Sequence, residues 1–373
     1  MDKLFEQFSS VSKLEWLAKI EKDLKGKSLS SLDWTIQKEF SVSPFSHADD
    51  LPVPPTPLTN ASANNQWEIG TRVVVKNWKT ANQEALLALE NGATAIGFVL
   101  NESPSKKELE TFLAGIELEW ISTNFISSQP AWKRFLRTFA SYLQRKKYDS
   151  QKIAGSFSFT GNFIKNKEEA KLWNEIAAQL PNMSLFTVNG RQYYGGTEHI
   201  IDELTDIIQK GNSYLETLDD YQMPLSKFAP RIQFSLTLDD SYLLNVAKIR
   251  ALKLLWLNVL DAWKITDKTY PSIEIHINDN SNSEDENYNK IKATSQALSA
   301  VIGGIKRLYV YPSDQFKDGV GTPFAQRIAL NIQHLLQLES YMDRVTDPAA
   351  GSYYLETLTN ELAERVWRRL SGC

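Results

Sequence analysis

The sequence predicts an α/β fold, a (β/α)8 barrel of the TIM type that follows an N-terminal helical and extended arm. From Trp67 onward, short β-branched or aromatic runs alternate with helical patterns. Several runs are apolar almost throughout, which is typical of parallel strands covered by helices. The runs number eight and extend over about the length that such a barrel needs. An open doubly wound sheet has the same periodicity, so the count of eight is what favours the barrel.

Residues 1–66 differ from the rest and are expected to form an arm and linker, with the barrel and its closing helices in 67–373. Val11 to Lys25 has the apolar spacing of a helix with one apolar face, and Gly26 is a plausible end for it. The proline-rich stretch at 51–58 and the polar run that follows have little capacity to form a core. We expect the arm to lie on its own barrel or on a partner.

The eight predicted strands follow in order as Arg72–Lys76, Ala95–Leu100, Trp120–Ile126, Ile153–Thr160, Leu185–Val188, Ile232–Leu238, Ser272–Ile277 and Arg307–Tyr311. Segments with helical periodicity separate them, and the periodicity is clearest in 81–92, 130–146, 167–180 and 241–263. The pair Gly303-Gly304, just before the last strand, is expected to end a helix.

Composition excludes several classes of function. The 373 residues are 42% hydrophobic and carry a net charge of −4, which gives no field suited to nucleic acid. Cys373 is the only cysteine, so no intramolecular disulfide or cysteine-based zinc site is expected. We also expect no secretion signal and no membrane span, and therefore a cytoplasmic protein.

Few residues suggest chemistry by themselves. No two of the four histidines have the spacing of a helical zinc site, so no metal is expected. His276 approaches the carboxyl end of a barrel strand, where active sites form, although filling of the barrel or contact with a helix is the favoured interpretation. Asp239 and Asp240 are compatible with an acid–base pair, but the favoured interpretation is a cap for a helix that begins near Ser241.

The stretch from Arg327 to Trp367 is the most informative part of the chain. It is predicted to form a helix that Asp347-Pro348 breaks, a turn, and a second helix that begins at Tyr353. Its pattern of residues resembles the sequence at the end of the barrel in the methylmalonyl-CoA mutase family. The matching residues are Arg327, Ile328, Ala329, Asn331, Gln333, Glu339, Ser340, Asp347, Pro348, Gly351, Ser352 and Tyr353.

Two further blocks are similar to the same family, in the same order. They are SKLEWLAKIEKDLKGKSLSSLDW near the start and FAPRIQFSLTLDDSYLLNVAKIRALKLLW at 228–256. The resemblance therefore extends from about Val11 to Trp367. It implies a (β/α)8 barrel that normally continues into a cobalamin domain. Because the sequence given stops at Cys373, we expect that domain to be absent and the chain to be a fragment.

The resemblance also implies that the catalytic residues are missing. The family's catalytic chain carries a tyrosine and a histidine after strand five, where this sequence reads NGRQYYGGTEH. Matching the aromatic pair places Tyr193 and Tyr194 at those positions, and a shift of two residues places Arg191 and Gln192 there. The histidine is absent in both cases. The family's Ile-Arg-Gln-Tyr-Ala-Gly segment and its cobalt-ligating Asp-Xaa-His-Xaa-Xaa-Gly motif have no counterpart.

These departures indicate the non-catalytic small subunit of a heterodimeric mutase. In the complete complex, the catalytic large subunit holds adenosylcobalamin and converts (R)-methylmalonyl-CoA to succinyl-CoA by a radical mechanism, and this chain binds no cofactor itself. One alternative is an active acyl-CoA enzyme with a pocket redesigned around Tyr193, Tyr194, Arg191, Asp239 and His276. Another is a regulatory or chaperone-like subunit for cobalamin loading. A barrel lumen packed shut excludes the pantetheine arm, whereas an open lumen admits it.

Overall fold

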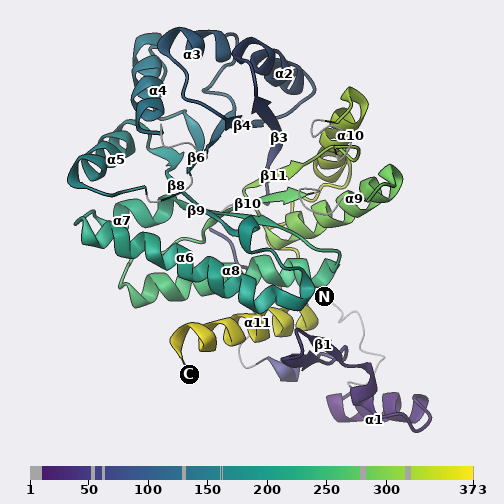
Figure 1. The fold of residues 1–373 in the computed structure, drawn as a ribbon. Coiled ribbons are helices and arrows are strands. Elements are labelled where there is room, and N and C mark those ends of the chain that lie inside the picture. Colours follow the sequence, from purple (N-terminus) through teal and green to yellow (C-terminus); the bar gives the residue numbers. More distant parts are fainter. Residues whose placement is uncertain are drawn as a thin grey trace, which may run out of the picture.

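A computed structural model describes residues 11–51, 55–60, 64–127, 132–159, 161, 163–277, 283–315 and 321–372 (Figure 1). Thr160, Cys373 and part of the proline-rich stretch lie outside the described residues. None of the helices within these ranges is long and apolar enough to cross a membrane.

Parallel strands form the centre of the molecule, in the spatial order β7-β6-β5-β4-β3-β11-β10-β9-β8. β7 pairs with β6 and β8 pairs with β9, and only Leu185 separates β7 from β8 along the chain. The two short segments thus act as one interrupted strand that closes the sheet. The strand bounds are β3 Glu68–Val75, β4 Ala95–Leu100, β5 Ser122–Ser127, β6 Ala154–Phe159, β7 Asn182–Ser184, β8 Phe186–Asn189, β9 Ile232–Thr237, β10 Ser272–Ile277 and β11 Arg307–Val310.

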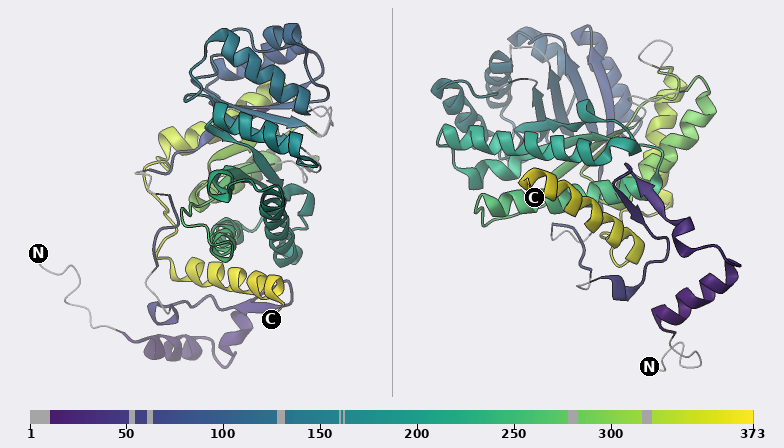
Figure 2. Two further views of the ribbon diagram at one scale, coloured as in Figure 1. Left: turned by 90° about the vertical axis from the view of Figure 1, so that its left-hand side faces the viewer. Right: turned by 60° about the horizontal axis from the view of Figure 1, so that its bottom comes forward.

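The closed sheet confirms the predicted (β/α)8 barrel over the doubly wound alternative. A helix follows each strand position and packs outside it (Figures 1 and 2). The barrel helices are α2 Trp78–Glu90, α3 Lys106–Phe112, α4 Trp132–Lys146, α5 Lys167–Gln179, α6 Ile200–Asp220, α8 Tyr242–Ala262, α9 Glu286–Gly303 and α10 Pro323–His334, and the short α7 Leu225–Phe228 precedes β9. Gly304 caps α9 in the left-handed conformation, as its sequence position predicts.

The inner face of β9 is polar. In β9, the outward residues are apolar, whereas Gln233, Ser235 and Thr237 alternate with them and are equally buried. Because successive side chains of a strand point to opposite faces, this period of two places one polar set inside the barrel. β9 therefore contributes polar side chains to the lumen, while its apolar residues join the core between the sheet and its helices.

The carboxyl end of the chain differs from the prediction at one point. α10 continues as a π-helical turn over Leu335–Glu339 and ends there, well before Asp347-Pro348. Tyr341 adopts a left-handed backbone conformation (φ 52°), which a helix cannot accommodate, so the predicted break at the proline was wrong. The second helix, α11 Tyr353–Ser371, begins at the predicted residue.

A buried ion network joins α8 to α11. The guanidinium of Arg250, fully excluded from solvent, forms ion pairs with Asp347 and, at 2.7 Å, with Glu356. Asp347 also accepts a hydrogen bond from the backbone N–H of Leu58 at 2.7 Å. Lys253, one helical turn from Arg250, donates to the carbonyl of Leu58 at 3.1 Å. This junction network fastens the segment before β3 and the last helix to the back of the barrel.

The arm has two unlike parts. The hairpin of β1 Trp34–Ile36 and β2 Phe40–Val42 packs against α6 and α11, where Gln37 accepts from the N–H of Ile201 at 2.7 Å and Arg369 pairs with Glu39. The helix α1 Lys13–Asp23 has no buried residue and stands away from the barrel (Figure 2). Its predicted apolar side chain Leu14 is 79% exposed.

Candidate functional site in the barrel lumen

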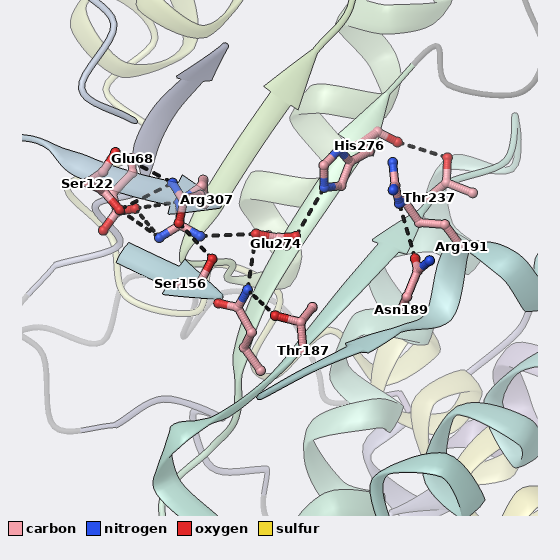
Figure 3. A network of polar contacts seen from close by, with 12 residues as sticks. Glu68, Ser122, Ser156, Thr187, Asn189, Arg191, Thr237, Glu274, His276 and Arg307 are labelled. Atoms are coloured by element: carbon pink, nitrogen blue, oxygen red, sulfur yellow. Dashed lines mark hydrogen bonds and ion pairs between the residues drawn. The ribbon is translucent and has the colours of Figure 1, made fainter. Parts of the chain in front are cut away.

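The lumen is built around one buried arginine. Arg307 on β11 forms ion pairs with Glu68 on β3 at 2.6 Å and with Glu274 on β10 at 3.0 Å, and it donates to the hydroxyl of Ser122 on β5 at 2.8 Å (Figure 3). Only 2% of the Arg307 side chain is exposed. A guanidinium presents several donors in one plane, so a single residue connects strands from both halves of the barrel.

His276 extends this network toward the carboxyl end of the barrel. Its Nε2 lies 3.2 Å from Glu274, and its Nδ1 lies 2.6 Å from the hydroxyl of Tyr311. A carboxylate can only accept, so Nε2 carries a proton and donates a hydrogen bond to Glu274. Arg191, after β8, donates to the same tyrosine oxygen at 3.5 Å. A chain of polar contacts thus runs along the lumen from Glu68 to Arg191. Figure 3 shows the part of it from Glu68 to His276.

The two carboxylates of the lumen network, Glu68 and Glu274, are held ionised by their neighbours. Burial would raise the pKa of Glu274, but the hydrogen bond and charge of His276 and the charge of Arg307 outweigh burial and lower that pKa to about 2. Burial also opposes ionisation of Glu68, whose pKa is nevertheless lowered by Arg307 and Lys306. Both carboxylates are therefore ionised near neutral pH, and they compensate the buried arginine.

Tyr309 fills the lumen beside this chain. Its side chain is fully buried, and its ring stacks on His276 with a centroid distance of 4.6 Å. A Cβ atom at Gly70 would lie 2.7 Å from the ring of Tyr309, and one at Gly97 would lie 3.1 Å from it. The two glycines leave just the room that the phenol occupies, so this level of the barrel is packed shut.

The two tyrosines after β8, Tyr193 and Tyr194, do not belong to the series of polar contacts in the lumen. The hydroxyl of Tyr194 donates to Asp239, and Lys248 lies 5.7 Å from the centre of its ring. Burial and the charge of Asp239 raise the pKa of Tyr194 well above its usual range. Tyr193 is half-buried and packs against the apolar core.

Asp239 has a role that the sequence did not predict. It accepts from the N–H and hydroxyl of Thr197, at 2.6 and 2.7 Å, and its pKa is lowered because these hydrogen bonds outweigh its burial. The cap of α8 is Ser241, without a side-chain hydrogen bond, while Asp240 pairs with Lys292 at 2.7 Å. The helix-capping interpretation of the aspartates was therefore wrong. The carboxylates point to different partners, which does not favour an acid–base pair.

The structure brings together only part of the predicted pocket. Arg191 and His276 meet at Tyr311, whereas Tyr194 and Asp239 form a separate cluster beside α6 and α8. Sequence reasoning missed the central residues Glu68, Glu274, Arg307 and Tyr309. For the last three, the signal is the polar or aromatic residue at every second position of SIEIHI and RLYVY, whereas Glu68 lies before the predicted strand Arg72–Lys76.

The described residues offer no cluster of metal ligands. No three His, Cys, Asp or Glu side chains are grouped there as ligands. Tyr194, which takes the place of the family's histidine when the aromatic pair is matched, has a phenol that is already bound to Asp239. A phenol bound in this way cannot replace an imidazole near neutral pH.

Comparison with known proteins agrees with the resemblance. The model of the family described as methylmalonyl-CoA mutase matches residues 96–372. A methylmalonyl-CoA mutase small subunit from Porphyromonas gingivalis is 29% identical over 98% of this chain and 63% of its own length. Another small subunit, from Streptomyces virginiae, is 27% identical over 81% of this chain and 50% of its own. A methylmalonyl-CoA mutase from Rhizobium meliloti is 31% identical over 51% of this chain and 27% of its own.

A solved structure of Yersinia pestis dihydropteroate synthase matches 81% of this chain and 98% of its own, with 10% identity and a TM-score of 0.39. The chain spans less than two thirds of the length of the small subunit from Porphyromonas gingivalis. The family model matches most of the chain, and both small subunits align with most of it. The chain therefore belongs to the methylmalonyl-CoA mutase family.

Proposed function

We propose that this chain is a structural, catalytically degenerate small subunit. It supports a large subunit that isomerises (R)-methylmalonyl-CoA to succinyl-CoA with adenosylcobalamin. The observation that carries this proposal is the packed lumen, where Tyr309 and the Arg307 ion pairs occupy the barrel axis. A lumen of this kind leaves no room for the pantetheine arm of an acyl-CoA.

The energetic cost of opening the lumen supports the same proposal. A pantetheine chain would have to displace the ring of Tyr309, which fits between Gly70 and Gly97, and separate Arg307 from Glu274. Breaking a buried ion pair by removing one partner costs about 3–5 kcal/mol. A ligand would have to supply this free energy before it gained any affinity.

The large subunit, as we propose, holds the cofactor. The phenol of Tyr194, which is bound to Asp239 and offers no imidazole, favours a cofactor held elsewhere. We also propose that residues 1–66 act as the arm. The exposed face of α1, with Leu14 and its half-buried neighbours Trp16 and Leu17, then contacts the large subunit. Exposed apolar and aromatic side chains of this kind are frequent anchors in interfaces.

One observation favours the alternative of an acyl-CoA enzyme. Arg191, His276 and Tyr311 converge at the carboxyl end of the barrel, where active sites of this fold form. The test is to assay the pure chain for succinyl-CoA formation with added adenosylcobalamin, alone and after mixing with a catalytic large subunit from the same source. We expect no turnover by the chain alone and co-elution with the large subunit. Turnover by the pure chain would overturn the structural role.

A further inference from the structure

A cleft outside the lumen has no place in the proposed function. It has a volume of about 240 Å³ and is lined by residues of α2 and α10, the first and last helices of the barrel. Figure 1 shows that these two helices are neighbours around the barrel. β11 pairs with β3 only from Glu68 to Gly70, and the chain turns away at Pro312. The part of β3 from Thr71 onward therefore borders the cleft on the side away from β4.

The walls of the cleft combine positive charge with apolar surface. Lys76 at the end of β3 and Arg327 on α10 line it from opposite sides, and Arg72 lines its inner end. Glu84 is the single acidic residue among the described lining residues. Leu87 presents an apolar side chain that is 51% exposed.

The inner end of the cleft reaches the polar chain of the lumen. Tyr311 lines it, and the guanidinium carbon of Arg72 lies 5.4 Å from the centre of that ring. The tyrosine hydroxyl is held by His276 at 2.6 Å. The cleft thus has an ordered polar end and an apolar wall, which are the two elements that orient small ligands in pockets.

We propose that this cleft binds a small organic anion, a carboxylate or phosphate group carried on a short apolar body. Lys76 and Arg327 on opposite sides against the single carboxylate of Glu84 favour an anion, and the apolar wall favours a short hydrocarbon or aromatic part. The volume lies below the roughly 300–1,000 Å³ of pockets for drug-sized ligands, which selects a small molecule.

This proposal is independent of the subunit role. The probes are hexanoate, hexyl phosphate, hexan-1-ol and inorganic phosphate, each titrated calorimetrically into the full chain. We expect saturable binding of hexanoate or hexyl phosphate at one site per chain, and the tighter of the two identifies the preferred head group. Hexan-1-ol and inorganic phosphate each lack one of the two features and should bind about tenfold more weakly or not at all.

Two variants locate the binding. Lys76→Glu reverses an exposed charge of the cleft and should weaken anion binding about fivefold or more. Lys79→Glu reverses an exposed charge on α2 that does not line the cleft, and it should change affinity by less than about twofold. Ala88→Phe should abolish binding by filling the cleft, and circular dichroism melting checks that each variant folds.

Any one of three results would overturn the proposal. The first is that neither hexanoate nor hexyl phosphate binds saturably, and the second is that hexan-1-ol binds as tightly as the anions. The third is that Lys76→Glu and Lys79→Glu change the affinity equally. Glu84→Gln sharpens the test because removing the one carboxylate should tighten anion binding about twofold. Unchanged or weaker binding in that variant would argue against an electrostatic site.

Discussion

Two buried arginines, Arg250 and Arg307, each pair with two carboxylates but lie in different parts of the molecule. Arg307 lies in the lumen between Glu68 and Glu274, and Arg250 lies behind α8 between Asp347 and Glu356. Both are almost completely excluded from solvent. The Arg250 network joins the last helix and the segment before β3 to the barrel, whereas the Arg307 network fills the lumen.

The two networks relate differently to the sequence blocks that carry the resemblance. Arg250 and Asp347 belong to those blocks, and the structure places both in the junction network. In the lumen, Arg307 and Tyr309 lie outside the blocks, whereas the polar residues of β9 lie inside the block at 228–256. The blocks therefore include all of the charged centre of the junction but only part of the lumen.

The largest expected effect comes from the junction network. Arg250→Ala leaves Asp347 and Glu356 buried without their cation, so the free energy of unfolding should fall by about 3–5 kcal/mol. The matched control is Arg368→Ala on α11, which removes an exposed pair with Glu364 and should cost less than about 1 kcal/mol. Denaturant unfolding followed by circular dichroism measures both. Equal losses would show that the junction is not a stabilising network.

Removing the arginine of the lumen network should lower the free energy of unfolding somewhat less than removing Arg250 from the junction network. Arg307→Met should lower the free energy of unfolding by about 3 kcal/mol. The loss is smaller because Glu68 keeps Lys306 at 3.1 Å and Glu274 keeps His276 at 3.2 Å. Adding Glu274→Gln to Arg307→Met removes a carboxylate that has lost its main cation, so the double variant should recover about 1 kcal/mol relative to additive losses. Strictly additive losses would contradict coupling across the lumen.

How far sequence reasoning succeeded depends on how local the signal is. β4 and β10 have the predicted bounds because each is a continuous apolar or alternating run. The break at Asp347 was wrong because the left-handed residue Tyr341 ends the helix earlier, and a tyrosine gives no local signal for that conformation. The lumen could not be predicted because Arg307 finds its partners on strands far away in the chain.

The pH dependence of stability tests the lumen network through Glu274. Glu274 has a pKa of about 2 in the folded chain against an ordinary value of 4.5, so its contribution to stability is complete above about pH 4.5 and is lost as the pH falls toward 2. The difference in unfolding free energy between wild type and Glu274→Gln should narrow over that window. Urea unfolding at several pH values measures this difference. A difference that stays constant from pH 5 to about pH 2 would show that Glu274 is not held ionised by its neighbours.

The smallest effect on stability is expected in the arm. Leu14→Asp changes an exposed side chain of α1, so the free energy of unfolding should change by less than about 0.5 kcal/mol. Binding to the large subunit should weaken about tenfold if α1 contacts it, as measured by calorimetry. The control Ile36→Asp changes a buried residue of the hairpin and should destabilise the chain. Unchanged affinity in Leu14→Asp would remove α1 from the proposed interface.

The most direct test of the central claim is calorimetric titration of methylmalonyl-CoA into the pure chain and into Ala88→Phe. A lumen closed by Tyr309 and Arg307 predicts no saturable binding to the Ala88→Phe chain, in which the outer cleft is also filled. Saturable binding that persists in this variant and is competed by coenzyme A would show that the lumen admits an acyl-CoA. It would contradict the proposal that this chain is a structural subunit.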